Sequence, residues 1–124
     1  MEIKIIKEIL QSHLLQKEIP FQVILPKSYD LSVIQYPVLY LLHGLFGSCE
    51  NWFELTKIRD YAVKKDLIII LAEGENSWYS DSIIIENDKF ESYFTEELIP
   101  LIESLYRCQK EKRAIAGLSM GGYG

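Results

Sequence analysis

Residues 113–124 read Arg-Ala-Ile-Ala-Gly-Leu-Ser-Met-Gly-Gly-Tyr-Gly, a short apolar strand pattern that runs directly into Gly-x-Ser-x-Gly. This motif presents a serine on a sharp turn between a strand and a helix. The turn strains the serine backbone and presses together the residues two positions before and after it, where only glycine avoids a clash. Gly117 and Gly121 meet that need, so Ser119 is the candidate nucleophile. The helix start would place the Met120 N–H beside the serine as an oxyanion donor.

A second motif stands where an oxyanion loop is expected. Residues 43–47 read His-Gly-Leu-Phe-Gly and follow the apolar run 37–42, which suits a buried strand. A loop in this position gives a second N–H to the oxyanion, and small residues let its backbone approach closely. We therefore expect Leu45 to donate through its backbone N–H, with Gly44 providing the room.

Neither histidine is a good general base. His43 comes before the nucleophile, whereas the base that serves a serine on such an elbow follows it in the chain. We expect His43 to shape its loop by hydrogen bonding to the backbone instead. His13 falls in a predicted N-terminal turn and would face solvent. The base also needs a carboxylate to orient it, and Asp81 is a poor candidate because it too precedes Ser119.

A third motif, Asn-Ser-Trp-Tyr-Ser-Asp at 76–81, follows the apolar run 67–72. If both apolar runs are parallel strands, their carboxyl ends share one edge of the sheet, where open α/β folds bind ligands. Trp78 and Tyr79 suit the wall of a substrate pocket. A plain loop anchored by Trp78 explains the same residues equally well.

The predicted elements alternate in an α/β order. The pattern at 3–10 fits a helical face or a strand, whereas 18–25 alternates clearly, and we interpret the two as an antiparallel pair. The runs at 37–42 and 67–72 predict parallel strands with helical turns between them. The region 89–107 predicts the strongest helix. Its apolar face comprises Tyr93, Phe94, Leu98, Leu101, Ile102 and Leu105.

Two details of that helix follow from single residues. Asp88 and Glu91 have the spacing of a capping pair at its start. Pro100 lies inside it and removes one backbone hydrogen bond, which predicts a kink or break at 95–97.

Composition limits the function classes. The 124 residues suit one domain, 1–124, and 13 basic against 18 acidic residues give a net charge of −5. This mild acidity argues against nucleic-acid or anionic-membrane partners. No apolar run approaches the ~20 residues of a membrane span, and the N-terminus does not resemble a signal peptide, so we expect a cytoplasmic protein. Cys49 and Cys108 fit no metal or redox spacing, and we expect free thiols, no metal and no cofactor.

The three motifs together resemble the putative-esterase family of α/β-hydrolases, which includes S-formylglutathione hydrolase (esterase D), tributyrin, feruloyl and acetyl-xylan esterases, and mycolyltransferases. The matching stretches are 40–47, 76–81, 96–100 and 113–124, and they look most like the tributyrin-esterase branch. The resemblance implies the N-terminal half of an α/β-hydrolase fold: a mostly parallel sheet with antiparallel N-terminal strands and flanking helices. Glu73 departs from the family, which often has aspartate there.

The resemblance also implies a serine carboxylesterase that hydrolyses short-chain acyl esters or thioesters through an acyl-enzyme on Ser119. An S-formylglutathione hydrolase, a carbohydrate (acetyl or feruloyl) esterase, or a noncatalytic remnant of a truncated gene are the alternatives. The substrate would be a small ester or thioester, while oligomeric state and acyl specificity stay open. Family members carry their acid and histidine in a second half, so we expect residues 1–124 alone to be inactive and poorly soluble, with one strand edge bare.

Overall fold

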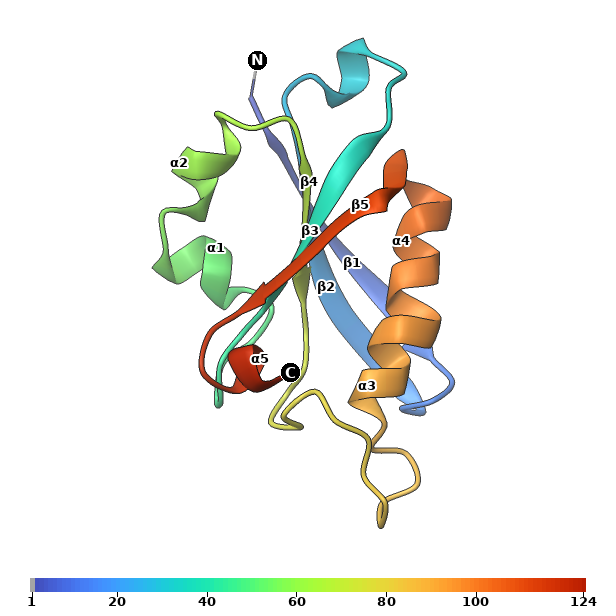
Figure 1. The fold of residues 1–124 in the computed structure, drawn as a ribbon. Helices are drawn as coiled ribbons and strands as arrows, with labels where there is room; N and C mark the ends of the chain where they lie inside the picture. Colours follow the sequence, from blue (N-terminus) through green and yellow to red (C-terminus); the bar gives the residue numbers. More distant parts are fainter. Residues whose placement is uncertain (1) are drawn as a thin grey trace.

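A computed structural model describes residues 2–124 as one twisted sheet with helices on both faces (Figure 1). Its five strands lie in the order β1-β2-β4-β3-β5. β1 pairs with β2 and β2 with β4 in antiparallel fashion, whereas β3 is parallel to both β4 and β5. This architecture confirms the predicted fold class. The strands are β1 (Lys4–Ser12), β2 (Lys17–Leu25), β3 (Tyr36–Leu42), β4 (Ile68–Ala72) and β5 (Cys108–Gly117).

The helices cover the sheet unequally. In Figure 1 the short α1 and α2 lie over one face, and the longer helix labelled α3 and α4 lies over the other. A 3₁₀ turn over Tyr29–Leu31 precedes β3. The helices are α1 (Asn51–Leu55), α2 (Ile58–Ala62), α3 (Phe90–Ser92), a π-helical segment (Tyr93–Leu98), α4 (Ile99–Leu105) and α5 (Met120–Tyr123).

Strand β4 shows why its sequence is a continuous apolar run. Ile68 and Ile70 belong to the larger core cluster, which also contains Leu98 and Ile102 of the long helix. Ile69 and Leu71 point the other way, into a second cluster beneath α1 and α2. Because successive side chains of a strand alternate between faces, a strand covered on both sides has to be apolar throughout.

Pro100 disturbs the long helix as predicted, but the helix does not break. The proline has no N–H for the carbonyl of Glu96, one turn earlier. The helix accommodates the missing hydrogen bond by widening to a π-helical segment over Tyr93–Leu98, and it continues directly into α4. The π-helix is rare, and it occurs mostly as such single turns inside α-helices.

The predicted capping pair at Asp88 is wrong. The helix begins at Phe90, and its N-cap residue makes no side-chain cap bond. Asp88 instead belongs to the preceding loop, where its carbonyl accepts the Ser82 N–H at 2.7 Å. The Asp81 carboxylate takes over at the helix start, because it accepts the Ser92 N–H at 2.9 Å and also the Ser92 hydroxyl.

Strand β5 lies at the edge of the sheet within residues 2–124. It pairs with β3 alone, and residues 110–119 are exposed. This confirms the expected bare edge. None of the helices in residues 2–124 combines the length and apolar character that crossing a bilayer requires; the cytoplasmic location stays a prediction.

Candidate active site

The three motifs meet at one end of the sheet. β3, β4 and β5 are parallel neighbours, so the loops that follow them leave from the same edge. Figure 1 shows this edge at the bottom of the view, where α5 lies beside the loops after β3 and β4. The sequence predicted this meeting from the order of its strands.

Ser119 sits on a strained elbow. Its φ of 56° and ψ of −112° lie outside the regions that non-glycine residues prefer, and α5 begins at the next residue. A Cβ at Gly117 would lie 2.2 Å from the Gly121 carbonyl carbon, and a Cβ at Gly121 would lie 2.4 Å from the carbonyl oxygen of Leu42. The elbow is therefore as crowded as the motif implied, and the Ser119 side chain remains exposed.

The candidate oxyanion loop, residues 43–47, packs directly against this elbow. A Cβ at Gly44 would lie 3.3 Å from the Leu118 carbonyl oxygen and 3.7 Å from the Ser119 Cβ. The Gly44 carbonyl accepts the Gly47 N–H at 3.1 Å, and Phe46 has a φ of 63°, which is typical of a type II turn.

Both candidate oxyanion donors are available. Neither the Leu45 N–H nor the Met120 N–H bonds a backbone carbonyl of residues 2–124. The two groups belong to the oxyanion loop and to the first residue of α5, on the two segments that meet at Ser119.

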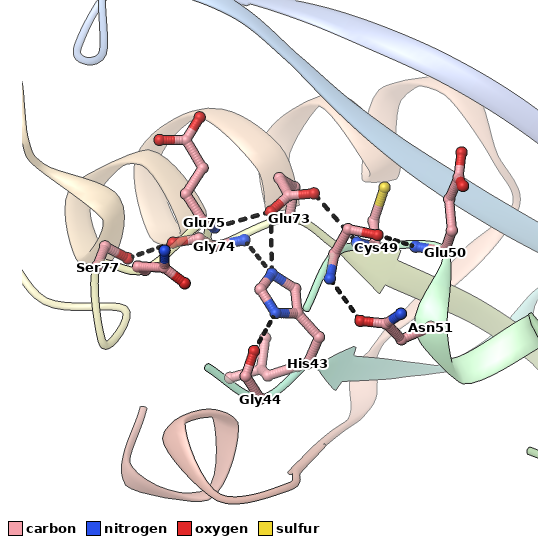
Figure 2. Close-up of polar contacts among 12 residues, drawn as sticks. His43, Gly44, Cys49, Glu50, Asn51, Glu73, Gly74, Glu75 and Ser77 are labelled. Atoms are coloured by element: carbon pink, nitrogen blue, oxygen red, sulfur yellow. Dashed lines mark hydrogen bonds and ion pairs between the residues drawn. The ribbon is translucent and has the colours of Figure 1, made fainter. Parts of the chain in front are cut away.

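His43 is buried, with 1% of its surface exposed, and both ring nitrogens are engaged (Figure 2). Nδ1 lies 2.7 Å from the Gly44 carbonyl oxygen. Nε2 lies 3.0 Å from a carboxylate oxygen of Glu73 and also 3.0 Å from the Gly74 nitrogen. These contacts support the loop-shaping role that the sequence suggested and leave no ring nitrogen free to accept a proton from a serine.

Glu73 is the site residue that sequence reasoning missed. It follows β4 directly, is 8% exposed, and accepts the N–H groups of Cys49 at 3.1 Å and Glu75 at 2.8 Å. Burial opposes ionisation, but hydrogen bonds from His43 and these two amides outweigh it and lower the pKa of Glu73. The available signal was a charged residue at the end of a buried apolar strand, where only a paired charge is tolerated.

Glu73 also contributes to the pKa shifts of His43 and Cys49. Burial by itself would lower the pKa of His43, but the bonds to Glu73 and Gly44 prevail and raise it above its ordinary 6.5. Burial and the Glu73 charge together raise the pKa of the Cys49 thiol to about 12. Cys49 and Cys108 are both free and buried, as predicted. Burial and the raised pKa of Cys49 both disfavour the thiolate, which is the reactive form.

Trp78 and Tyr79 have different environments, although both carry a positive φ. Tyr79 is 7% exposed, and its hydroxyl donates to the His43 carbonyl at 3.0 Å, so it helps to anchor the oxyanion loop. Trp78 is 43% exposed and packs edge-on against Tyr123 with ring centroids 5.6 Å apart. A cavity of about 380 Å³ is lined by both residues together with Phe94 and Tyr123. Their substrate contact stays a prediction.

A second, more apolar cavity of about 200 Å³ lies on the α1 side of the elbow. Leu45 and Leu118 line it beside Trp52, whose indole N–H donates to the Leu42 carbonyl at 3.1 Å. Trp52 thus packs beside the site and against the second core cluster at once.

A mixed sheet in which β4, β3 and β5 are parallel, with a strained serine between strand and helix, defines an α/β-hydrolase. The chain belongs to the Putative esterase family, whose family model matches residues 12–124. An esterase of Mycobacterium tuberculosis is 38% identical over 109 residues, which is 82% of this chain and 24% of that protein. An acetyl esterase of Caldicellulosiruptor saccharolyticus is 35% identical over 101 residues, or 77% of this chain and 36% of that protein.

Solved structures give the same assignment. A ferulic acid esterase superposes with a TM-score of 0.88 at 32% identity, and covers 98% of this chain and 52% of its own. The S-formylglutathione hydrolase of Staphylococcus aureus superposes with a TM-score of 0.85 at 27% identity, over all of this chain and 50% of its own. The chain thus spans about half the length of these structures and a quarter to a third of the curated relatives.

Proposed function

We propose that residues 1–124 carry the nucleophile and oxyanion portion of a serine esterase site. The observation that carries the proposal is the strained Ser119 elbow with the Gly44 backbone packed against it. In the reaction the Ser119 oxygen bonds the ester carbonyl carbon, the alcohol or thiol leaves with a proton, and water then releases the acid from the acyl-enzyme. The N–H groups of Leu45 and Met120 would stabilise the oxyanion at each step.

The general base and its carboxylate would come from outside residues 1–124. Both ring nitrogens of His43 are engaged, and His13 is exposed in the β1–β2 turn. The twofold length of the structural relatives supports this division. We accordingly expect residues 1–124 alone to show no Ser119-dependent turnover.

The proposed substrates are short-chain acyl esters or thioesters. Three relatives are named as acetyl esterase, ferulic acid esterase and S-formylglutathione hydrolase, so they share acyl transfer to water but differ in the acyl and leaving groups. The small apolar cavity bounded by Leu45 and Leu118 suits a short acyl chain better than a charged one.

The test uses the protein expressed from its complete reading frame. Hydrolysis of p-nitrophenyl acetate and butyrate should be lost in Ser119→Ala, and a fluorophosphonate probe should label Ser119. Ser104→Ala is the matched control, because the Ser104 hydroxyl bonds only the carbonyl of Leu101 in its own helix, at 2.7 Å. Undiminished hydrolysis by Ser119→Ala would refute the proposal.

A further inference from the structure

Two consecutive carbonyls of the oxyanion loop are held by side chains. The His43 carbonyl accepts the Tyr79 hydroxyl at 3.0 Å. The Gly44 carbonyl accepts from the His43 Nδ1 at 2.7 Å and from the Gly47 N–H at 3.1 Å. The loop is therefore fixed at the peptide units that flank Gly44, and not only at its ends.

The hydrogen bond from His43 Nδ1 to the Gly44 carbonyl sets the direction in which the Leu45 N–H, the candidate oxyanion donor, points. The Gly44 carbonyl and the Leu45 N–H belong to one planar trans peptide, in which the two groups point in opposite directions. Whatever holds the Gly44 carbonyl toward the His43 ring therefore holds the Leu45 N–H away from it. A rotation of this peptide would remove the donor without moving Leu45 from its place in the chain.

The contact requires a proton on Nδ1, because a carbonyl oxygen only accepts. That proton is present in the imidazolium, whose Nε2–H is donated to Glu73, and in the neutral tautomer whose Nε2 accepts the Gly74 N–H. It is absent from the remaining tautomer, which protonates Nε2 alone. Because the Glu73 carboxylate can only accept at Nε2 and the Gly44 carbonyl can only accept at Nδ1, the imidazolium alone makes both contacts at once.

The Glu73 carboxylate is held in a fixed position beside Nε2 of His43. Its two oxygens face three donors, namely the Cys49 N–H, the Glu75 N–H and Nε2 of His43 (Figure 2). A carboxylate satisfies all three, whereas a glutamine has one oxygen and would turn its NH₂ group toward one of them. A neutral partner would also remove the charge that favours the imidazolium, and an amide oxygen at Nε2 would select the neutral tautomer protonated on Nε2 alone, which cannot donate to the Gly44 carbonyl.

We propose that Glu73 is a positioning residue that acts through His43: its carboxylate pairs with the imidazolium, which donates Nε2–H to Glu73 and Nδ1–H to the Gly44 carbonyl and so aims the Leu45 N–H at the oxyanion. The proposal rests on the proposed function, since it assigns the residue that prepares one donor of that site. The proposal gives Glu73 no direct contact with Ser119 or with the substrate.

The kinetic test compares carboxylate variants in the protein expressed from its complete reading frame. Glu73→Gln should lower kcat by at least about tenfold. The upper limit is the roughly hundred- to thousand-fold loss that follows complete removal of one oxyanion donor. KM should stay within about twofold, because the oxyanion bond forms only in the transition state. Glu73→Asp keeps the charge and should recover part of the loss. Glu75→Gln is the matched control, since the Glu75 side chain pairs with Lys17 on the surface.

A second measurement needs no turnover. Ring ¹⁵N–¹H correlation spectra should show protons on both Nδ1 and Nε2 of His43, with His13→Gln to assign the two histidines. The Leu45 amide resonance should move in Glu73→Gln and stay in place in Glu75→Gln. A wild-type His43 that carries a single ring proton, on either nitrogen, would overturn the proposal, as would a Glu73→Gln variant with unchanged kcat and Leu45 resonance. If the wild type lacks esterase activity, the proposed function fails and the spectra still decide the role of Glu73.

Discussion

At the scale of single residues, the adjacent Gly121 and Gly122 of the elbow differ in how closely other atoms surround them. A Cβ at Gly121 would lie 2.4 Å from the carbonyl oxygen of Leu42 and 2.8 Å from its carbon, and both belong to backbone that cannot rotate away. A Cβ at the neighbouring Gly122 meets nothing closer than 3.5 Å. Alanine variants at these two adjacent positions therefore compare a crowded glycine with an uncrowded one.

We therefore predict that Gly121→Ala lowers the free energy of unfolding by about 1–3 kcal/mol, the usual cost of overpacking. Gly122→Ala should leave it unchanged or raise it by no more than about 1 kcal/mol, because alanine favours a helix over glycine. Urea unfolding of the two variants measures the difference. Equal midpoints would show that α5 does not press against the end of β3 as described.

The His43–Glu73 pair predicts a pH dependence of stability. The folded-state pKa of His43 is raised above 6.5, so its contribution is complete below pH 6.5 and is lost as pH rises through the raised value. The folded-state pKa of Glu73 is lowered below 4.5, so its contribution is present above pH 4.5 and is lost as pH falls through the lowered value. The stability advantage of wild type over Glu73→Gln should therefore be largest between pH 4.5 and 6.5.

Urea unfolding at several pH values checks this prediction, with Glu75→Gln as the control. The Glu75 pair with Lys17 is half-exposed, and such surface pairs contribute little at any pH. A Glu73→Gln deficit that does not vary with pH would contradict the charge pairing and leave only hydrogen bonding.

At the scale of elements, the start of the long helix is stabilised from outside. The Asp81 carboxylate accepts the Ser92 N–H, which is one of the amides that a helix leaves unpaired at its first turn. Its slight burial would raise the pKa of Asp81, but the bonds from Ser92 outweigh this and lower it. The carboxylate is therefore ionised and replaces the missing N-cap side chain.

We predict that Asp81→Ala lowers the free energy of unfolding by about 1 kcal/mol, the typical cost of losing a cap. Asp88→Ala should change it by less than about 0.5 kcal/mol, because the Asp88 contacts in the loop are made by its backbone. Thermal unfolding of the two variants distinguishes them. A larger effect at Asp88 would restore the capping pair that the sequence spacing suggested.

These elements show which features a sequence reveals. Gly117 was predictable because the atoms that would meet its Cβ belong to Gly121 and Gly122, within five residues. Gly121 followed from the motif alone, since the atoms that would meet its Cβ belong to Leu42 and His43, far away in the chain. Strand β4 was predictable because burial on both faces leaves an uninterrupted apolar run. Asp81 and Glu73 were missed because their partners lie 11 and 30 residues away, and only the folded chain brings them together. Local sterics and periodicity are written in the sequence, whereas long-range polar pairing is not.

At the scale of the whole molecule, β5 joins the candidate site to the outer edge of the sheet. The strand that presents Ser119 pairs on one side only within residues 2–124, and Ile115 in its middle is 57% exposed. An unpaired apolar edge is a template for another strand. The same edge would therefore limit both the solubility of residues 1–124 and the rigidity of the elbow.

We predict that residues 1–124, expressed alone, self-associate through β5. Ile115→Lys should reduce the associated fraction, because a charge on an edge strand opposes strand pairing. Ile83→Lys is the control: Ile83 is 98% exposed but lies in a loop, so the substitution removes apolar surface without touching the edge. Light scattering after size-exclusion chromatography measures both. If Ile83→Lys reduces association as strongly as Ile115→Lys, exposed apolar surface in general, and not the β5 edge, drives it.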